Sequence, residues 1–99
     1  MMKYTIEVID YDDGIKLTYE PDATISATHS AYGETVIQAN RNGLITLAKM
    51  LLTLAQDGVP SGSHIHLDEY NFLEDGSSEL ILVRRENWEN NQEKYKNNA

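Results

Sequence analysis

The chain has 99 residues, of which 40% are hydrophobic and 24% are charged, a composition typical of a soluble globular protein. A chain of this length buries roughly 60–65% of its unfolded surface, which is enough for one modest core. It contains no cysteine, so disulfides, thiolate catalysis and cysteine-based zinc sites are excluded. No apolar run approaches the ~20 residues of a membrane span, and the N-terminal ten residues lack the pattern of a signal peptide. We therefore expect one domain, located in the cytoplasm.

The formal net charge is −8, and the acidic residues are concentrated in two regions. Residues 1–40 contain seven acids and two bases, and residues 68–79 contain five acids and no base. Such a surface repels nucleic-acid phosphates and anionic membranes, so neither is an expected partner. It would attract a basic protein, and the alternative is that it only keeps the protein in solution.

Residues 3–20 show the two-residue alternation of β-strands. In KYTIEVID, the apolar residues Tyr4, Ile6 and Val8 alternate with polar residues. The alternation resumes in IKLTYE, after a turn with the sequence Asp-Asp-Gly at residues 12–14. Two alternating runs around Asp-Gly predict a β-hairpin.

Two further strand candidates follow. The first is ATISATHS, residues 23–30, in which Ile25, Ala27 and His29 share one face, so that His29 is expected to face the core. The second is ETVIQA, residues 34–39, which is reached through a turn containing glycine.

The segment GLITLAKMLLTLAQDG, residues 43–58, predicts an amphipathic helix. Asn40 or Asn42 can cap its start, and Gly58 followed by Pro60 is expected to end it. Apolar residues recur at steps of three and four and are expected to form one buried stripe against a sheet. They are Leu44, Leu47, Ala48, Leu51, Leu52 and Ala55.

After the helix, SHIHLD and SELILVRR predict a second antiparallel hairpin around an acidic loop. Because residues 80–83 are apolar on both alternating faces, we expect this strand to be central and covered on each side. The resulting fold class is α+β, with the order β-β-β-(β)-α-β-β. A single antiparallel sheet of five or six strands would be covered on one face by one long helix. The domain would span residues 1–86, and residues 87–99 would form a polar tail, frayed or short-helical, from which Trp88 could fold back onto the sheet.

His64, His66 and Asp68 recur at alternate positions of one predicted strand. If Ile65 and Leu67 face the core, these three residues face away from it, and side chains two apart lie about 6–7 Å apart, within reach of one metal ion. A catalytic zinc normally needs three protein ligands, however, and Asp68 would have to reach back. We therefore expect no metal site, and we keep a small metal-binding protein or metalloenzyme using His64, His66 and Asp68 as the alternative. No catalytic motif is present, so we expect neither enzymatic activity nor a cofactor.

The outer face of the second hairpin and the acidic loop together have the character of a protein-binding surface, with apolar and aromatic residues beside an acidic rim. The same surface could instead be covered by the chain's own C-terminal tail or by a second copy of the chain in a homodimer. The candidate contact residues are His64, His66, Asp68, Glu69, Tyr70, Glu74 and Asp75.

Three stretches of the second half form a recognisable set. They are Asn40, Gly43 and Leu44 at the start of the leucine-rich helix, then His-Ile-His-Leu-Asp at 64–68, and Ser-Glu-Leu at 78–80. In this set, over residues 36–86, the chain resembles the immunity protein 32 family of bacterial polymorphic toxin systems. The resemblance implies a non-enzymatic cytoplasmic protein that binds and neutralises a cognate toxin, and it assigns no binding residue. Against a basic nuclease toxin, acidic side chains would take the place of the substrate's phosphates.

Overall fold

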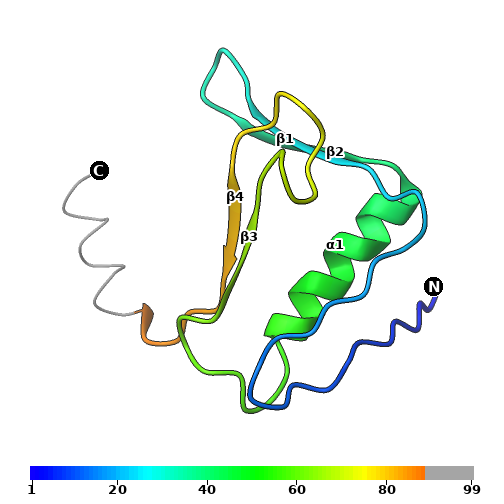
Figure 1. Cartoon of the computed structure of the whole chain (residues 1–99), viewed down its shortest axis with the longest axis vertical. Helices are drawn as coiled ribbons and strands as arrows, with labels where there is room; N and C mark the ends of the chain where they lie inside the picture. Colours follow the sequence, from blue (N-terminus) through cyan, green and yellow to red (C-terminus); the bar gives the residue numbers. More distant parts are fainter. Residues whose placement is uncertain (89–99) are drawn as a thin grey trace.

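A computed structural model describes residues 1–88 of the chain, and within them it contains two antiparallel strand pairs and one helix (Figure 1). β1 pairs with β2, and β3 pairs with β4, as two separate two-stranded sheets. The predicted α+β class is confirmed, and the predicted single sheet of five or six strands is wrong. The elements are β1 (Ile25–His29), β2 (Thr35–Ala39), α1 (Arg41–Leu54), β3 (His64–Leu67) and β4 (Leu80–Val83).

β1 and β2 form a hairpin at the position predicted for the third and fourth strands. Cross-strand partners run from Ile25 opposite Ala39 to His29 opposite Thr35. The turn is closed by the Ser30 amide, which donates to the Glu34 carbonyl at 2.8 Å. Gly33 has a φ of 86°, a left-handed conformation that glycine adopts without steric cost.

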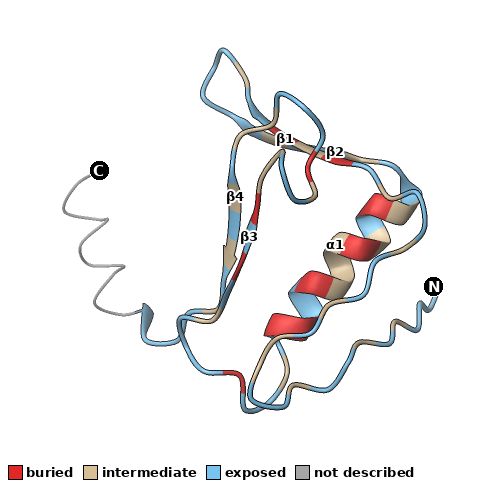
Figure 2. Ribbon diagram, in the orientation of Figure 1, coloured by how far each residue is buried: buried red, intermediate tan, exposed pale blue. Residues whose placement is uncertain are grey.

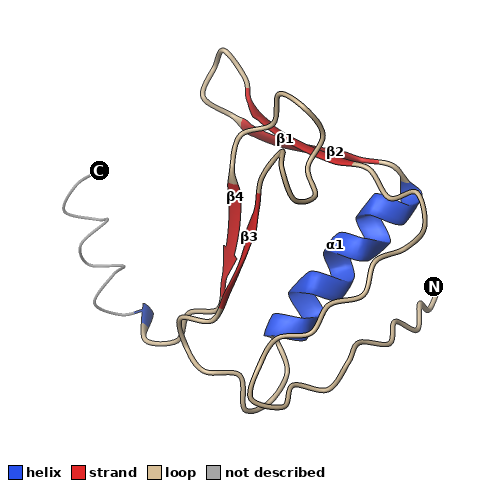
Figure 3. Cartoon of the chain, viewed as in Figure 1, coloured by secondary structure: helices blue, strands red, loops and turns tan. Residues whose placement is uncertain are grey.

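The loop between β3 and β4 occupies the outer edge of β1. The Glu74 amide donates to the Ile25 carbonyl at 2.9 Å, and the Ser78 amide donates to the Ala27 carbonyl at 2.7 Å. This irregular loop takes the place of a neighbouring strand, so the two hairpins meet without merging into one sheet. Figure 3 shows the two strand pairs running in different directions beside α1.

Residues 1–24 are extended, but they contain no β-strand. The predicted turn is present, with Asp13 at a φ of 58°, yet no backbone hydrogen bond joins the two segments on either side of it. Each segment is bonded instead to helix side chains or to residues near the helix. The Tyr11 amide donates to Gln56 Oε1 and the Glu20 amide to Thr46 Oγ1, each at 2.9 Å. The predicted hairpin over residues 3–20 is therefore wrong, because the helix and the turn after it each bind one of the two segments.

Asn40 caps the N-terminus of α1, as the sequence predicted. Its Oδ1 accepts from the Gly43 amide at 2.7 Å and from the Thr24 amide at 3.0 Å, and its Nδ2 donates to the Asp22 carbonyl at 2.8 Å. One side chain thus caps the helix and ties it to the segment that leads into β1.

The C-terminus of α1 lies at Leu54, before the glycine that was expected to end the helix. Arg84, directly after β4, donates from Nη1 to the carbonyls of Leu54 and Gln56. The Leu54 carbonyl is among those that a helix end leaves without an intrahelical partner, and the Gln56 carbonyl lies in the turn just beyond it. A cation at this end also complements the helix dipole. The contact therefore joins β4 to the end of the helix.

The buried face of α1 differs from the predicted stripe (Figure 2). Three leucines of that stripe, Leu44, Leu51 and Leu52, are 54%, 50% and 45% exposed. The core side carries small and polar residues whose hydrogen bonds are satisfied, such as Thr53, whose Oγ1 donates to the Lys49 carbonyl at 2.7 Å. A pattern of hydrophobicity cannot detect such a face, because it ranks residues by polarity. It carries no information on how closely a residue lets the helix approach a neighbouring segment. The buried residues are Gly43, Thr46, Met50, Thr53 and Leu54.

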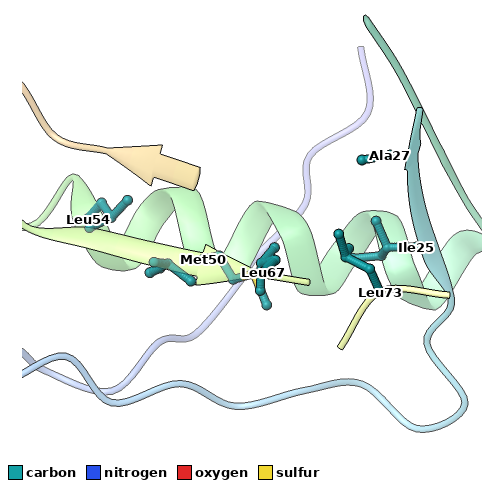
Figure 4. Packing of buried hydrophobic residues seen from close by; sticks show 7 residues of the cluster. Ile25, Ala27, Met50, Leu54, Leu67 and Leu73 are labelled. Carbon is teal, nitrogen blue, oxygen red and sulfur yellow. The ribbon is translucent and has the colours of Figure 1, made fainter. Parts of the chain in front are cut away.

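The core lies between α1, β1 and β3 (Figure 4). Ile65 and Leu67 of β3 are buried in it, as the alternation of the strand predicted. Leu73 joins them from the loop after β3. The full cluster consists of Ile25, Ala27, Met50, Leu54, Ile65, Leu67 and Leu73.

The one helix within residues 1–88 is too short to span a membrane. Trp88 is half exposed, and its ring lies under the Arg85 guanidinium at 5.8 Å. Trp88 and Val83 line the same small pocket. Most of the predicted polar tail, from residue 89 onward, lies outside the described residues.

Substitution of Gly43 tests the contact between α1 and the segment before β1. Alanine at an ordinary helix position is about 1 kcal/mol more favourable than glycine. Here a Cβ would overlap the Thr24 carbonyl oxygen, so we expect Gly43→Ala to lower the free energy of unfolding by about 1–3 kcal/mol. Urea unfolding measures the change. Gly14→Ala is the control, because open space surrounds that position, and it should change stability little. A Gly43→Ala protein as stable as the parent would contradict the close approach.

Candidate protein-binding surface

The outer face of the β3–β4 hairpin is the candidate site. His64 lies opposite Val83 and His66 opposite Ile81, so these four side chains share one face. Ile81 and Val83 are 52% and 53% exposed, and both histidines are exposed. The expectation that β4 is central and covered on both sides is wrong, because β4 has β3 as its one neighbour within residues 1–88. We call these four residues the histidine–isoleucine–valine face.

The two histidines have different neighbours. Nδ1 of His64 lies 3.2 Å from the Gly62 carbonyl oxygen, and Nε2 of His66 lies 3.6 Å from Glu79 Oε2. Because Glu79 is 70% exposed, the pair with His66 is a solvated contact of the kind that contributes little to stability. The histidine–isoleucine–valine face therefore joins apolar surface to a carboxylate at its edge.

The third histidine does not face the core, contrary to expectation. His29 is exposed at the end of β1, and its Nδ1 lies 3.4 Å from Thr35 Oγ1 of β2. Ile25 and Ala27 share its side of the strand and are buried. The strand pair continues past the edge of the core, so parity correctly assigns the side of His29 but not its burial.

Asp68 organises the loop that follows β3. Its Oδ1 accepts from the amides of Tyr70 and Asn71 at 2.9 and 3.0 Å, and its carbonyl accepts from the Leu73 amide at 2.8 Å. The Asn71 side chain returns to the strand, with its Nδ2 donating to the His66 carbonyl at 2.9 Å. This is the local turn geometry that aspartate and asparagine favour.

The alternative metal set of His64, His66 and Asp68 is not brought together. The Asp68 carboxylate accepts from loop amides instead of extending along the outer face. Within residues 1–88, no group of three or more histidine, aspartate or glutamate side chains could hold a metal ion. Two histidines alone do not make a zinc site.

The loop from Asp68 to Glu79, which we call the acidic loop, is anchored at several points. Oε2 of Glu69 accepts from the Gly76 amide at 3.0 Å, and the backbone hydrogen bonds to β1 hold the loop further along. Tyr70 at 90% exposure, Glu74 and Asp75 extend into solvent. Of the seven predicted contact residues, two lie on the outer face, two make hydrogen bonds inside the loop, and three lie on the loop surface.

An apolar groove next to the outer face was missed by the sequence reasoning. It lies between β4 and the C-terminal half of α1 and has a volume of about 550 Å³. Its walls include Leu51 of the helix, Ala55 at the C-cap of the helix, and Ile81 and Val83 of the strand. A signal was present, because residues 80–83 are apolar at every position, so that both faces of β4 carry apolar side chains.

The fold and the surface define a small α+β protein with an open sheet face beside an anchored acidic loop. The sequence model of the immunity protein 32 family matches residues 34–85, more than half of the chain. The chain therefore belongs to the immunity protein 32 family. The matched region contains β2, α1, β3, the acidic loop and β4, so the candidate surface lies inside it. Comparisons with curated proteins and with solved structures gave no match.

Substitution of Asp68 tests its structural role in the turn after β3. Asp68→Ala removes the acceptor for two loop amides, and we expect it to lower the free energy of unfolding by about 1–2 kcal/mol. Asp68→Asn keeps the Oδ1 acceptor and should retain most of the stability. Thermal and urea unfolding measure both changes. Equal losses in the two variants would contradict the turn role and indicate that the negative charge matters.

Proposed function

We propose that the protein is an immunity protein that neutralises a cognate toxin of a bacterial polymorphic toxin system by direct contact. The observation that carries the proposal is the open histidine–isoleucine–valine face, which adjoins the acidic loop within the region that the family model matches. The protein would act in the cytoplasm as a binding protein, with no cofactor and no catalytic step of its own.

The charge of the loop supports a basic partner. The acidic loop holds five carboxylates and no base, in a chain whose net charge is −8. Complementary charges on two proteins raise the rate of association, by as much as 10–10³-fold at low salt. Tyr70, Glu74 and Asp75 extend from an anchored backbone, so little backbone conformational entropy is lost when a partner binds them. A toxin that acts on nucleic acid would present such a basic surface.

The apolar part of the surface supports a stable contact once the partners have met. Ile81 and Val83 lie side by side with two histidines and are half exposed. A few well-packed residues near the centre of an interface carry most of its free energy, and the contacts around them exclude water. We infer that these two residues form the centre and that the acidic loop forms part of the rim.

Reversal of charge on the acidic loop tests the electrostatic part. We expect Glu74→Lys with Asp75→Lys to slow association with the protein encoded by the adjacent gene by about 10-fold or more at low salt, with a smaller effect at high salt. Stopped-flow mixing or surface plasmon resonance measures the rates. Asp12→Lys with Asp13→Lys, on the N-terminal turn, makes the same change in net charge and is the matched control. Equal slowing by both pairs would show that net charge acts and that the loop is not the contact.

Truncation on the strand face tests the apolar part. We expect Ile81→Ala with Val83→Ala to speed dissociation of the toxin complex by 10-fold or more and to reduce protection of cells that express the toxin. Ile37→Ala on β2 removes an exposed isoleucine of the other strand pair and should leave both unchanged. If the adjacent gene product neither binds the protein nor harms cells, the proposed function fails as a whole.

A further inference from the structure

α1 carries an apolar seam on the side that faces away from the core. Leu44, Ala48, Leu51 and Ala55 follow one another at steps of four, three and four residues, which is the spacing of a helix–helix contact. Leu44 and Leu51 are at least half exposed, and Ala55 is exposed. We call these four residues the leucine–alanine seam. Soluble proteins rarely leave an ordered apolar stripe of this kind without a partner.

Two apolar grooves flank the seam. One is the groove of about 550 Å³ between Leu51, Ala55 and β4. The other, of about 260 Å³, lies between the N-terminal half of α1 and the extended N-terminal segment, and its walls include Leu44, Ala48 and Tyr4. A helix laid on the seam would therefore have space on each side for large side chains.

We propose that the leucine–alanine seam is the interface between two copies of this chain, with the two α1 helices packed antiparallel about a twofold axis. In that arrangement Leu44 lies opposite Ala55 of the second copy, and Ala48 lies opposite Leu51. Each large side chain then meets a small one at all four contacts, which is the complementarity that close helix packing requires. A twofold interface uses the same patch on both copies, and this seam is complementary in size to itself.

The charges on and near α1 favour the same antiparallel arrangement of two copies. The chain has 16 acidic residues, and α1 contains none of them, so the two helices meet without opposing carboxylates. Glu86 lines the larger groove, where its carboxylate is paired with Arg84 of the same copy. Arg41 at the start of the helix and Asp57 just beyond its end are both exposed. Antiparallel packing places Arg41 of each copy near Asp57 of the other, and it also aligns the two helix dipoles favourably.

The seam alone is too small for a stable dimer, so the contact includes further residues. A stable dimer buries about 800 Å² on each partner, which exceeds what four leucine and alanine side chains can provide. The walls of the grooves supply the remainder, since Tyr4, Ile81 and Val83 are each about half exposed. Leu44 of the second copy enters the larger groove, and Leu51 of the second copy enters the smaller one. This dimer goes beyond the proposed toxin binding and does not depend on it.

Light scattering with size-exclusion chromatography tests the oligomeric state of the full chain over a wide range of concentration. We expect a monomer–dimer equilibrium that Leu51→Glu shifts toward monomer by about 100-fold or more in Kd, because the twofold axis places the buried carboxylate in the interface twice. Ile37→Glu adds the same charge at an exposed isoleucine of β2 and should leave the equilibrium unchanged. Ala48→Phe, which introduces bulk without charge, should also dissociate the dimer. Circular dichroism confirms that each variant is folded.

Disulfide cross-linking tests the antiparallel register, because the native chain has no cysteine. A mixture of Ala48→Cys and Leu51→Cys proteins should form a mixed disulfide under mild oxidation, and so should a mixture of Leu44→Cys and Ala55→Cys proteins. Leu44→Cys mixed with Ala48→Cys should not. In the antiparallel dimer, residue 44 of one copy lies about 16 Å along the helix axis from residue 44 of the other, and the same holds for residue 55. Efficient cross-linking of Leu44→Cys with itself and of Ala55→Cys with itself would therefore show parallel packing and overturn the proposal.

Other occupants of the seam give distinct results. A chain that is monomeric at every concentration and forms no cross-link overturns the dimer, and so does a dimer that survives Leu51→Glu. If a version that ends at residue 88 dimerises while the full chain does not, residues 89–99 cover the seam, and the dimer of the full chain is again overturned. Loss of toxin binding in Leu51→Glu, together with a monomeric parent, would identify the toxin as the occupant. The loop variants Glu74→Lys and Asp75→Lys report on toxin binding separately, since they lie away from the helix.

Discussion

The contact between Gly43 and the Thr24 carbonyl determines how the rest of the structure is arranged. Glycine in the first turn of α1 lets the helix approach the backbone before β1 more closely than any other residue allows. The Asn40 side chain holds the same two segments together by hydrogen bonds to Gly43, Thr24 and Asp22. Once Gly43 faces β1, the helical period brings Thr46, Met50, Thr53 and Leu54 to the core side. The leucines on the opposite side must then face outward.

The other end of the helix is held by a cation. Arg84 donates to the carbonyls of Leu54 and Gln56, and so joins the end of β4 to the end of α1. Polar contacts therefore hold both ends of the helix, while a small set of apolar residues fills the space between the helix and the strands. A core of this size leaves apolar surface on both β4 and α1. Those two surfaces are the ones that the proposed contacts use.

The two surfaces differ in their chemistry. The outer face of β3 and β4 combines histidine and β-branched residues with an acidic loop, which suits a basic partner. The seam on α1 is apolar and has no acid within the helix, which suits a surface like itself. The larger groove runs between them, so Ile81 and Val83 border both surfaces. A partner at one surface would therefore alter the surroundings of the other.

Local chemistry was sufficient to predict much of this molecule from its sequence. Asn40 as the helix cap, the strands at 25–29, 35–39, 64–67 and 80–83, and the inward Ile65 and Leu67 all follow from residue type and spacing. The outward histidines follow from the same parity, although the role of the face that they share stays a prediction. Asp68 shows the limit of such prediction at the candidate site. Its spacing placed it beside the histidines, but its carboxylate accepts hydrogen bonds from amides of the loop.

Only the tertiary structure decided which elements lie against which. Residues 3–20 alternate as a hairpin would, but a strand needs a partner. These segments are bonded instead to the side chains of Thr46 in the helix and Gln56 just after it. The loop after β3 takes the edge of β1, which divides the expected sheet into two. The rotation of α1 depends on one close backbone approach at Gly43, which has no signature in hydrophobicity. Residue type and periodicity thus determined the helix, the four strands from residue 25 onward and the inward face of β3, because those depend on neighbours in the chain. Strand pairing and the rotation of the helix depend on contacts between segments far apart in it.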